Sequence, residues 1–251
     1  MPALVPALPP MIDLVRVIVV VPAYREERQI GRVLATLPAS VDAAIVVDDG
    51  SPDGTAEEVR LAAARDPRVT LVRNATNLGV GATIARGYRE SARLFPGERA
   101  ALVVLAGDGQ MSPDDLPRVV APIARGEADY VKGNRFVLEG VSAMPLGRRI
   151  GGRVFSRLTA LATGLPIGDS QCGYTALDRD AVARLDIDDL WPGFGYPNDL
   201  LGQLAARGMR VVEVPVATIY GDESSKLGVR HLPRIGWLVG RAFVRRKVAG
   251  R

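Results

Sequence analysis

The chain has 251 residues, and 47% of them are hydrophobic, so it can bury a sizeable core in one large α/β domain or two small ones. Its single cysteine excludes an internal disulfide and fits a reducing compartment, and its single histidine excludes a histidine-rich zinc site. The net charge of +4 is uneven, because residues 226–251 contain eight Lys and Arg and no acid, which leaves −4 on residues 1–225. This distribution argues against nucleic-acid binding by the chain as a whole.

The first half of the sequence alternates short apolar runs with longer amphipathic segments. The predicted strands cover residues 17–21, 44–47, 69–72 and 101–105. The predicted helices cover residues 26–37, 55–65 and 81–94, and a further helix starts at Ser112. Strands and helices that alternate over short connections predict a parallel sheet wrapped by right-handed crossovers.

The second half is less regular. Strands are predicted at residues 130–133 and 211–216, and helices at 150–163, from 181 onward and at 199–207. There is no internal repeat or linker, so we expect a single domain spanning residues 1–251. No apolar run approaches the roughly 18 residues of a membrane-spanning helix, and the first residues carry no basic start of a signal peptide. The protein is therefore expected to be soluble or to lie on a membrane surface.

Polar residues follow three of the predicted strands, at residues 22–26, 48–51 and 108–110. In an open parallel sheet, ligands bind beyond the carboxyl ends of the strands. Ordinary turn chemistry explains any one of these clusters. Three clusters at one sheet edge, each with a carboxylate, predict a binding site.

A glycine-containing loop, Asn-Leu-Gly-Val-Gly at residues 77–81, also follows a strand and precedes a helix. In a dinucleotide-binding fingerprint the third glycine would fall at Ile84, and the loop would follow the first strand rather than the third. A Rossmann dehydrogenase is therefore disfavoured. The glycines allow the backbone to approach a bulky group, or they simply turn the chain.

Four segments, taken together and in this order, resemble the inverting nucleotide-sugar glycosyltransferases of family 2: VVVPAYREERQIGRVL, IVVDDGSPDGTAEEV, NLGVGATIARGY and LAGDGQMSPDDL. Residues 133–136 (GNRF), 168–177 (GDSQCGYTAL), 195–216 and 221–228 (GDESSKLG) are similar to the polyprenyl-phosphate branch, typified by dolichyl-phosphate mannose synthases. The resemblance covers about residues 15–230. It implies the GT-A fold, a Rossmann-like and mostly parallel sheet flanked by helices. Residues 15–130 would then form the nucleotide-sugar-binding half, 131–225 the acceptor half and 226–251 a basic amphipathic tail.

The resemblance implies that a nucleotide-sugar donor, linked to GDP or UDP, lies against the first half. The aromatic ring of Tyr24 offers a stacking face, and carboxylates accept hydrogen bonds from ribose hydroxyls or base N–H groups. The residues placed in this role are Pro22, Tyr24, Glu26, Asp48, Asp49 and Gly81.

The segment Leu-Ala-Gly-Asp-Gly-Gln at residues 105–110 matches the metal-binding D-x-D motif of the family, but Ala106 replaces the first aspartate. The resemblance therefore leaves Asp108 and Gln110 as ligands of a divalent cation, Mg²⁺ or Mn²⁺. Mg²⁺ keeps several waters and is held by one or two protein oxygens plus substrate phosphates, so the shortened motif suffices in principle. The other interpretation is an Asp-Gly turn without a metal.

The resemblance also implies a polyprenyl-phosphate acceptor, to which the sugar is transferred with inversion. A phosphate is already anionic and requires cations rather than a strong base, and the planar fork of Arg135 suits phosphate oxygens. Lys226 is a weaker candidate for the same role. For Arg135 alone, an ordinary surface charge is the competing interpretation.

Two alternatives remain open at this stage. An acceptor hydroxyl would need a base, and Asp199 lies where many family members carry one; Asp169 is a second acid to consider, although either aspartate can simply cap a helix. A catalytically inactive, membrane-recruited binding protein is the other alternative, and Ala106 favours it. Cys172 and His231 are interpreted as packing and tail residues.

Two segments combine apolar periodicity with basic side chains. Residues 146–161 carry Ile150, Val154, Leu158 and Leu161 at helical spacing with arginines between them, and the tail from Arg234 onward is similar. Such segments bind anionic membrane surfaces, although core helices with basic rims would share the pattern. We expect a peripheral protein at the cytoplasmic face of a membrane.

Overall fold

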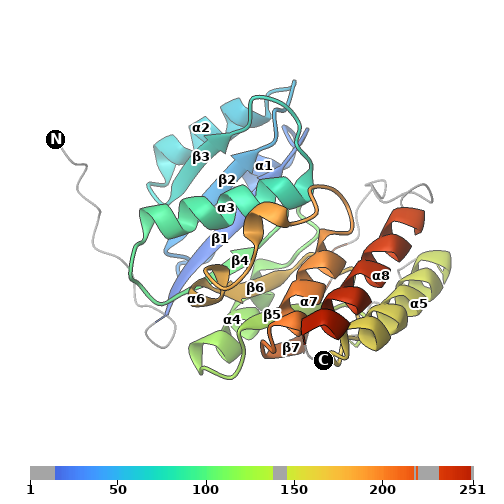
Figure 1. Cartoon of the computed structure of the whole chain (residues 1–251). Helices are drawn as coiled ribbons and strands as arrows, with labels where there is room; N and C mark the ends of the chain where they lie inside the picture. The colour runs from blue at the N-terminus through green and yellow to red at the C-terminus, as the bar shows by residue number, and fades with distance from the viewer. Residues whose placement is uncertain (1–14, 138–145, 218, 220–231, 250–251) are drawn as a thin grey trace.

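The computed structural model describes residues 15–137, 146–217, 219 and 232–249 (Figure 1). Its strands are β1 (Arg16–Ala23), β2 (Ala43–Asp48), β3 (Val69–Arg73), β4 (Ala100–Val104), β5 (Tyr130–Asn134), β6 (Thr175–Asp178) and β7 (Val211–Pro215). Its α-helices are α1 (Ile30–Ala35), α2 (Thr55–Arg65), α3 (Val80–Leu94), α4 (Leu116–Ala124), α5 (Leu146–Thr163), α6 (Arg179–Val182), α7 (Tyr196–Ala206) and α8 (Leu232–Ala249). Among the described residues, the 3-10 turns Pro113–Asp115 and Ile187–Asp189 precede α4 and α7.

The seven strands form one sheet in the order β3-β2-β1-β4-β6-β5-β7. All neighbouring strands are parallel except at β6, which runs antiparallel to both β4 and β5. The predicted, mostly parallel sheet is therefore confirmed. The strand β6 was not predicted, because four residues between two loops give too short an apolar run to stand out from the sequence.

Alternation along the central strand β1 divides the core into two layers. Val17, Val19 and Val21 pack into one buried cluster with α1, α2 and α4. Ile18 and Val20 point to the opposite face and pack with α3 and α7. Because both faces of β1 are covered by helices, the strand is an uninterrupted apolar run, as expected for a buried parallel sheet.

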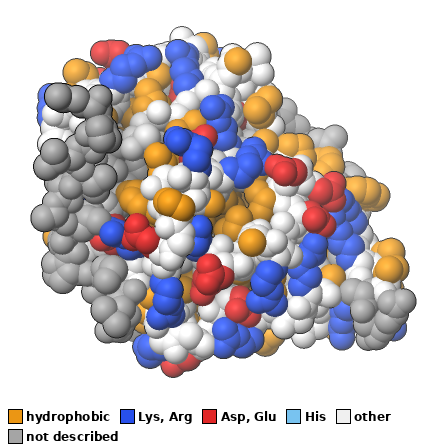
Figure 2. All heavy atoms as spheres, turned by 60° about the vertical axis from the view of Figure 1, so that its left-hand side comes forward, with side chains coloured by type: hydrophobic (Ala, Val, Ile, Leu, Met, Phe, Trp, Pro, Cys, Tyr) orange, Lys and Arg blue, Asp and Glu red, His pale blue; other side chains and the backbone are white. Residues whose placement is uncertain are grey.

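The helices α5, α7 and α8 form a separate layer beside the second half of the sheet, where α8 contacts both α7 and α5 (Figure 1). The other side of the molecule, which Figure 2 brings forward, shows basic and acidic side chains interspersed. The described side chains on that view thus form no extended surface of a single sign. Within the described residues, no helix is both long and apolar enough to cross a bilayer.

The helices predicted at residues 26–37, from 181 onward and at 199–207 differ in their bounds from the observed ones. The helix predicted over residues 26–37 is only Ile30–Ala35, because residues 24–29 form a turn in which Arg25 has a positive φ of 58°. The helix predicted from residue 181 is one turn long, Arg179–Val182. The helix predicted over residues 199–207 begins earlier, at Tyr196, with Pro197 in its first turn.

Candidate active site

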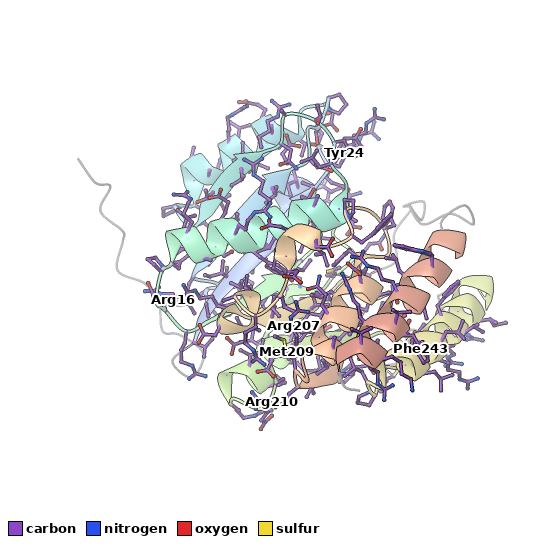
Figure 3. The ribbon with its side chains drawn as sticks, in the orientation of Figure 1. Arg16, Tyr24, Arg207, Met209, Arg210 and Phe243 are labelled. Carbon is purple, nitrogen blue, oxygen red and sulfur yellow. The ribbon has the colours of Figure 1, made fainter. Side chains whose placement is uncertain are left out.

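The three polar clusters lie together at one edge of the sheet, as predicted. The end of β1 is the centre of this edge, since Asp49 N–H donates to Ala23 O at 2.8 Å and Gly107 N–H donates to Pro22 O at 3.3 Å. Figure 3 labels Arg16 and Tyr24 at opposite ends of β1, with Tyr24 at the edge that carries the clusters. The carboxyl ends of β1, β2 and β4 therefore converge as an open parallel sheet requires.

The turn after β1 holds Tyr24 half-buried beside an exposed arginine. The guanidinium carbon of Arg25 lies 5.5 Å from the centre of the Tyr24 ring, within the range of a cation–π contact. Arg25 N–H donates to Ser51 Oγ at 3.1 Å, and Glu26 N–H donates to Thr55 Oγ1 at 2.8 Å. These two bonds fix the turn against the chain after β2 and set the direction of the Tyr24 ring.

The two aspartates that end β2 are buried and bonded to the protein itself. Asp48 accepts Ser51 N–H at 3.1 Å and forms an ion pair with Arg73 at 2.9 Å. Asp49 accepts Asn74 Nδ2 at 2.7 Å and the N–H groups of residues 78 and 79 at 2.9 and 2.8 Å. Both carboxylates thus organise the loops on which a nucleotide would lie, and their predicted direct contact with a nucleotide stays a prediction.

Gly81 has a packing reason to be glycine. Its N–H donates to Pro192 O at 2.7 Å, and a Cβ at residue 81 would lie 2.0 Å from the carbonyl oxygen of Trp191. Such a separation is far inside van der Waals contact. The loop at residues 77–81 therefore fits closely against residues 191–192, and the bulky group that the sequence suggested includes this neighbouring backbone.

Asp108 and Gln110 occupy a tight turn directly after β4. Gly109 supplies a φ of +74°, and Gln110 N–H donates to Asp108 Oδ1 at 3.1 Å. The donor set is one carboxylate and one carboxamide, both of them hard oxygen ligands. In the described parts of the chain no cluster of three or more His, Cys, Asp or Glu could hold a metal. These residues fit a cation such as Mg²⁺ that also takes diphosphate and water oxygens.

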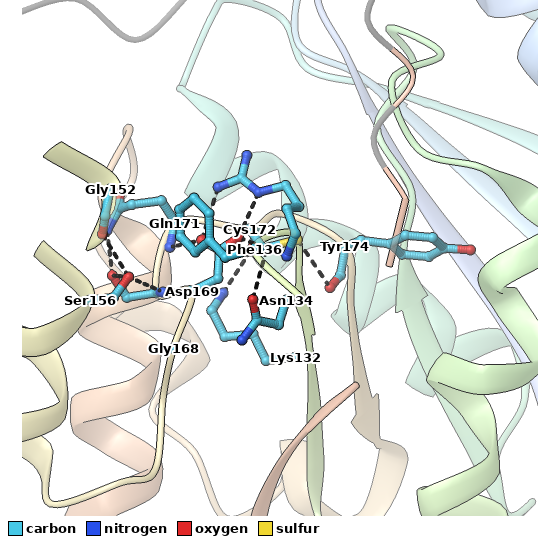
Figure 4. Close-up of polar contacts among 12 residues, drawn as sticks. Lys132, Asn134, Phe136, Gly152, Ser156, Gly168, Asp169, Gln171, Cys172 and Tyr174 are labelled. Atoms are coloured by element: carbon cyan, nitrogen blue, oxygen red, sulfur yellow. Dashed lines mark hydrogen bonds and ion pairs between the residues drawn. The ribbon is translucent and has the colours of Figure 1, made fainter. Parts of the chain in front are cut away.

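The predicted phosphate-binding arginine, Arg135, is held by the buried Asp169, which Figure 4 labels among the neighbouring polar residues. Asp169 accepts Arg135 Nε at 2.7 Å and Nη2 at 2.9 Å, which is a bidentate ion pair, and it also accepts the Arg135 N–H at 3.2 Å. Burial by itself raises the pKa of Asp169, but the Arg135 guanidinium more than offsets this and holds the pKa below its usual 3.8. Asp169 is thus a poor general base, and it caps no helix.

This ion pair exists because β6 is antiparallel. The loop at residues 168–174 leads into β6, and an antiparallel strand begins at the edge where its parallel neighbours end. Lys132 pairs with Thr175, and Gly133 N–H donates to Tyr174 O at 2.8 Å. The loop therefore lies directly beside the end of β5, where Arg135 follows.

Two further charged residues, Lys132 and Glu213, lie near this pair and were not predicted from the sequence. The side chain of Lys132 is fully buried, and its Nζ donates to Cys172 O at 2.6 Å; burial lowers the pKa of this amine. Glu213, on β7, accepts N–H groups from the loop that carries Asp169. The sequence does carry a signal for Glu213: it is a charged residue between two valines, Val212-Glu213-Val214, within a predicted strand.

Asp199 lies in the first turn of α7, and both of its carboxylate oxygens have protein partners. Oδ2 accepts Trp191 N–H at 3.0 Å, and Oδ1 accepts Arg245 Nη1 at 2.6 Å. Burial raises the pKa of Asp199, although Arg245 opposes the shift. A raised pKa suits a base, but this carboxylate faces α8, so a role as base requires it to leave Arg245.

Contacts join the turn of Asp108 to the loop of Asp169. Tyr174 Oη donates to Ser112 O at 3.1 Å, and a Cβ at residue 173 would lie 3.0 Å from Met111 Cε. The chain after β7 returns to the same place, since Ile219 N–H donates to Gln110 O at 3.0 Å. The predicted metal and acceptor residues thus belong to one continuous edge. Lys226 and His231 lie outside the described residues.

The two segments with amphipathic patterns are helices, α5 and α8, and both expose apolar side chains. On α5 the exposed fractions of Ile150, Val154, Leu158 and Leu161 lie between 46% and 76%. On α8 the exposed apolar residues are Trp237, Phe243, Val244 and Val248; Figure 3 labels Phe243 on this helix. The interpretation of these four α5 residues as core is therefore wrong.

Comparisons with known proteins agree with the order of the motifs. Residues 18–191 match the family model described as glycosyl transferase family 2. An undecaprenyl-phosphate mannosyltransferase of Micrococcus luteus is 31% identical over 91% of each chain. A polyprenol monophosphomannose synthase of Mycolicibacterium smegmatis is 31% identical, over 80% of this chain and 76% of that one. These relatives extend the similarity well into the second half of the chain.

A structural comparison supports the fold independently. The glucosyl-3-phosphoglycerate synthase of Mycobacterium tuberculosis, crystallised with Mn²⁺, uridine diphosphate and phosphoglyceric acid, superposes with a TM-score of 0.67. The match covers 94% of this chain and 78% of that one at 22% identity, which is a likeness of fold. The sheet, the site edge and the sequence match lead to one conclusion: the chain belongs to glycosyl transferase family 2, and its sequence resembles the polyprenyl-phosphate branch of that family.

Proposed function

We propose that this protein transfers a sugar, with inversion, from a nucleoside-diphosphate sugar to a polyprenyl phosphate at a membrane surface. The observation that carries the proposal is the bidentate Arg135–Asp169 pair at the sheet edge that also bears Asp108. With Nε and Nη2 on Asp169, the guanidinium of Arg135 is held in one orientation, and a fixed cation suits a phosphate better than a mobile lysine would. The Micrococcus luteus and Mycolicibacterium smegmatis relatives, named for transfer to such lipids, support this choice of acceptor.

The proposed reaction forms one bond and breaks another at the anomeric carbon. A phosphate oxygen of the lipid attacks this carbon as the bond to the donor diphosphate breaks, and the nucleoside diphosphate leaves with the electron pair. A divalent cation, when bound, neutralises charge on the leaving diphosphate. Asp108 and Gln110 would hold it, Arg135 would orient the attacking phosphate, and Tyr24 would stack on the base. The identity of the nucleotide, GDP or UDP, is left open.

A saccharide hydroxyl is the alternative acceptor, with Asp199 as base. The raised pKa of Asp199 favours this alternative. Its bonds to Trp191 N–H and Arg245 disfavour it, because a base must reach the proton that it removes. We therefore rank the lipid phosphate first.

The proposed membrane contact is made by α5 and α8. Their exposed apolar side chains stand next to arginines and, within 147–161 and 236–248, no acidic residue occurs. Apolar side chains that enter the headgroup region and arginines that attract anionic lipids together give peripheral binding. We place this contact at the cytoplasmic face, where the donor sugar would be available.

Transfer from radiolabelled GDP- and UDP-sugars to polyprenyl phosphate, or to a free saccharide, tests the proposal. Arg135→Ala should strongly reduce transfer to polyprenyl phosphate while nucleoside-diphosphate binding stays near that of the wild type. Asp199→Asn should cost little, because the nucleophile carries no proton to remove. The reverse order, with a loss of roughly 10²–10⁴ in Asp199→Asn, would show that a hydroxyl is the acceptor.

The same assay tests the cation. Chelation should abolish transfer, and Asp108→Asn should abolish transfer in the presence of added Mg²⁺ or Mn²⁺ while circular dichroism shows an intact fold. Wild-type transfer by Asp108→Asn would remove this residue from the metal site. A wild-type protein that binds nucleoside diphosphate but turns over no donor with either acceptor would instead be the non-catalytic binding protein that Ala106 suggested.

A further inference from the structure

The carboxylate of Glu213 is bonded to three groups around the Arg135–Asp169 pair. Glu213 lies on β7 directly opposite Lys132 on β5. Its Oε2 accepts Asn134 Nδ2 and Gly168 N–H, both at 2.8 Å, and its Oε1 accepts Asp169 N–H at 2.9 Å. One side chain thus ties the end of β5 to the two residues that start the loop at 168–174.

These bonds hold the start of the loop at residues 168–174 where there is little free space around the backbone. A Cβ at residue 168 would lie 2.6 Å from Asn134 Nδ2 and 3.1 Å from Glu213 Oε2, so only glycine fits there without displacement. The backbone N–H of Asp169 is held by Glu213, while its side chain is held by Arg135. Asp169 is therefore held at both its backbone N–H and its carboxylate, and its position depends on that of the Glu213 carboxylate.

The charge of Glu213 matters as well as its shape. Lys132 is fully buried beneath the loop, and Arg135 is largely buried above it. Asp169 and Glu213 supply two negative charges to these two positive ones. An amide at residue 213 would keep the size of the side chain, but it would turn one acceptor into a donor facing another donor and would leave a buried positive charge unbalanced.

We propose that Glu213 is a positioning residue for the acceptor phosphate, acting through Asp169 on the guanidinium of Arg135. The inference rests on the proposed function, because it takes Arg135 as the group that binds the phosphate. Glu213 itself need not touch the substrate. Its effect is to hold the guanidinium of Arg135, whose Nε and Nη2 donate to Asp169, in one orientation toward the acceptor phosphate.

The test measures kinetics of Glu213→Gln with polyprenyl phosphate as the varied substrate. We expect the KM for polyprenyl phosphate to rise roughly tenfold, the effect of losing one hydrogen bond to a charged group, with a smaller change in kcat. Binding of nucleoside diphosphate should not change. Glu127→Gln, which removes an exposed acid paired with Arg125, is the matched control and should behave like the wild type.

A double-mutant cycle separates positioning from general support of the fold. In an Arg135→Ala background, Glu213→Gln should cause no further loss of kcat/KM, because the group that it orients is gone. If Glu213→Gln does not fold, Gly168→Ala, which displaces the same loop without a change of charge, should raise the KM for polyprenyl phosphate in its place.

Outcomes that contradict the role of Glu213 can be distinguished from those that contradict the proposed function. An equal loss from Glu213→Gln with and without Arg135 would show a merely structural role and overturn the inference. Impaired Arg135→Ala together with a wild-type KM in Glu213→Gln would overturn it as well, while the proposed function would stand. Unimpaired transfer by Arg135→Ala would overturn both.

Discussion

Two buried aspartates with arginine partners differ in the direction of their pKa shift, because they accept different numbers of hydrogen bonds. Asp169 accepts three bonds from Arg135 and a fourth from Gln171 N–H, and its pKa is lowered in spite of burial. Asp199 accepts two bonds, from Arg245 at 2.6 Å and from Trp191 N–H at 3.0 Å, with Arg241 more distant at 3.5 Å, and burial prevails to raise its pKa. The pKa of the same residue type is thus lowered at one site and raised at the other.

The first prediction concerns stability and pH at the Arg135–Asp169 pair. In the wild type the lowered pKa of Asp169 contributes stability that is present above pH 3.8 and lost as the pH falls below it. Arg135→Ala should cost about 3 kcal/mol of unfolding free energy at pH 7, since it leaves a buried charge unpaired. Burial then raises the pKa of Asp169, so the variant regains stability as the pH falls towards 3.8.

Urea denaturation of both proteins at pH 7 and at pH 4 checks this expectation. The difference in unfolding free energy should be smaller at pH 4 than at pH 7. Arg60→Ala, which breaks an exposed pair with Glu57, is the control and should cost under about 1 kcal/mol at either pH. A difference for Arg135→Ala that stays constant with pH would mean that Asp169 does not titrate as inferred.

At the scale of elements, the outer helix α8 is joined to α7 by a close backbone approach. A Cβ at Gly202 would lie 2.7 Å from Ala242 Cβ and 3.0 Å from its Cα. Small residues at this crossing let Arg245 reach Asp199 and let the Trp237 ring meet that of Trp191, with 5.9 Å between the ring centres. The position of α8 therefore depends on a single glycine of α7.

Gly202→Ala should loosen α8 even though alanine is the better helix former. We expect faster hydrogen exchange across 236–248 and a loss of about 1–3 kcal/mol of stability from overpacking. Gly240→Ala on α8 is the matched control, because nothing lies within 4 Å of a Cβ there; it should gain up to about 1 kcal/mol from helix propensity. Equal exchange rates in both variants would show that the crossing tolerates the methyl group.

The sequence predicts long elements well and side-chain partners poorly, for physical reasons. The buried strand at residues 17–21 is an unbroken apolar run, and it extends over Arg16–Ala23 in the structure. The antiparallel β6 is set by its neighbours rather than by its own pattern, so it was missed. The motifs singled out Arg135 as a phosphate-binding residue and Asp169 only as an acid to consider, and their contact depends on the direction of β6. Glu213 is 44 residues from Asp169 along the chain, and the pairing of β5 with both β6 and β7 brings them together.

At the scale of the whole molecule, the exposed apolar side chains of α5 and α8 require an explanation. Leu161 is 76% exposed and Phe243 is 47% exposed. Isolated exposed apolar residues are common, but several on two adjacent helices indicate an interaction surface. The exposed arginines nearby, which include Arg153 and Arg157, favour an anionic lipid surface over a neutral one.

Leu158→Glu combined with Leu161→Glu should therefore weaken binding to vesicles that contain anionic lipids. The two changes remove apolar contact and add repelling charge. Sedimentation with such vesicles measures the effect, and raised salt should weaken binding of the wild type too, because exposed charges are screened within about 8 Å at physiological ionic strength. Leu61→Glu, at an exposed leucine of α2, is the control. Unchanged binding by the double variant would exclude α5 from the contact.

The sheet order also dictates when during folding the acceptor residues can meet. The strands β1 to β4 are complete by Val104 and are joined by nearby crossovers, so their half can form early. The strand β5 joins the sheet only later, since Val131 pairs with Ala176 of β6 and with Val212 of β7. Contacts of such long sequence separation form slowly, because loop-closure entropy opposes them. On the ribosome, a growing chain would thus possess the proposed donor edge well before Arg135, Asp169 and Glu213 come together, and the proposed acceptor site could form only after β7 has been synthesised.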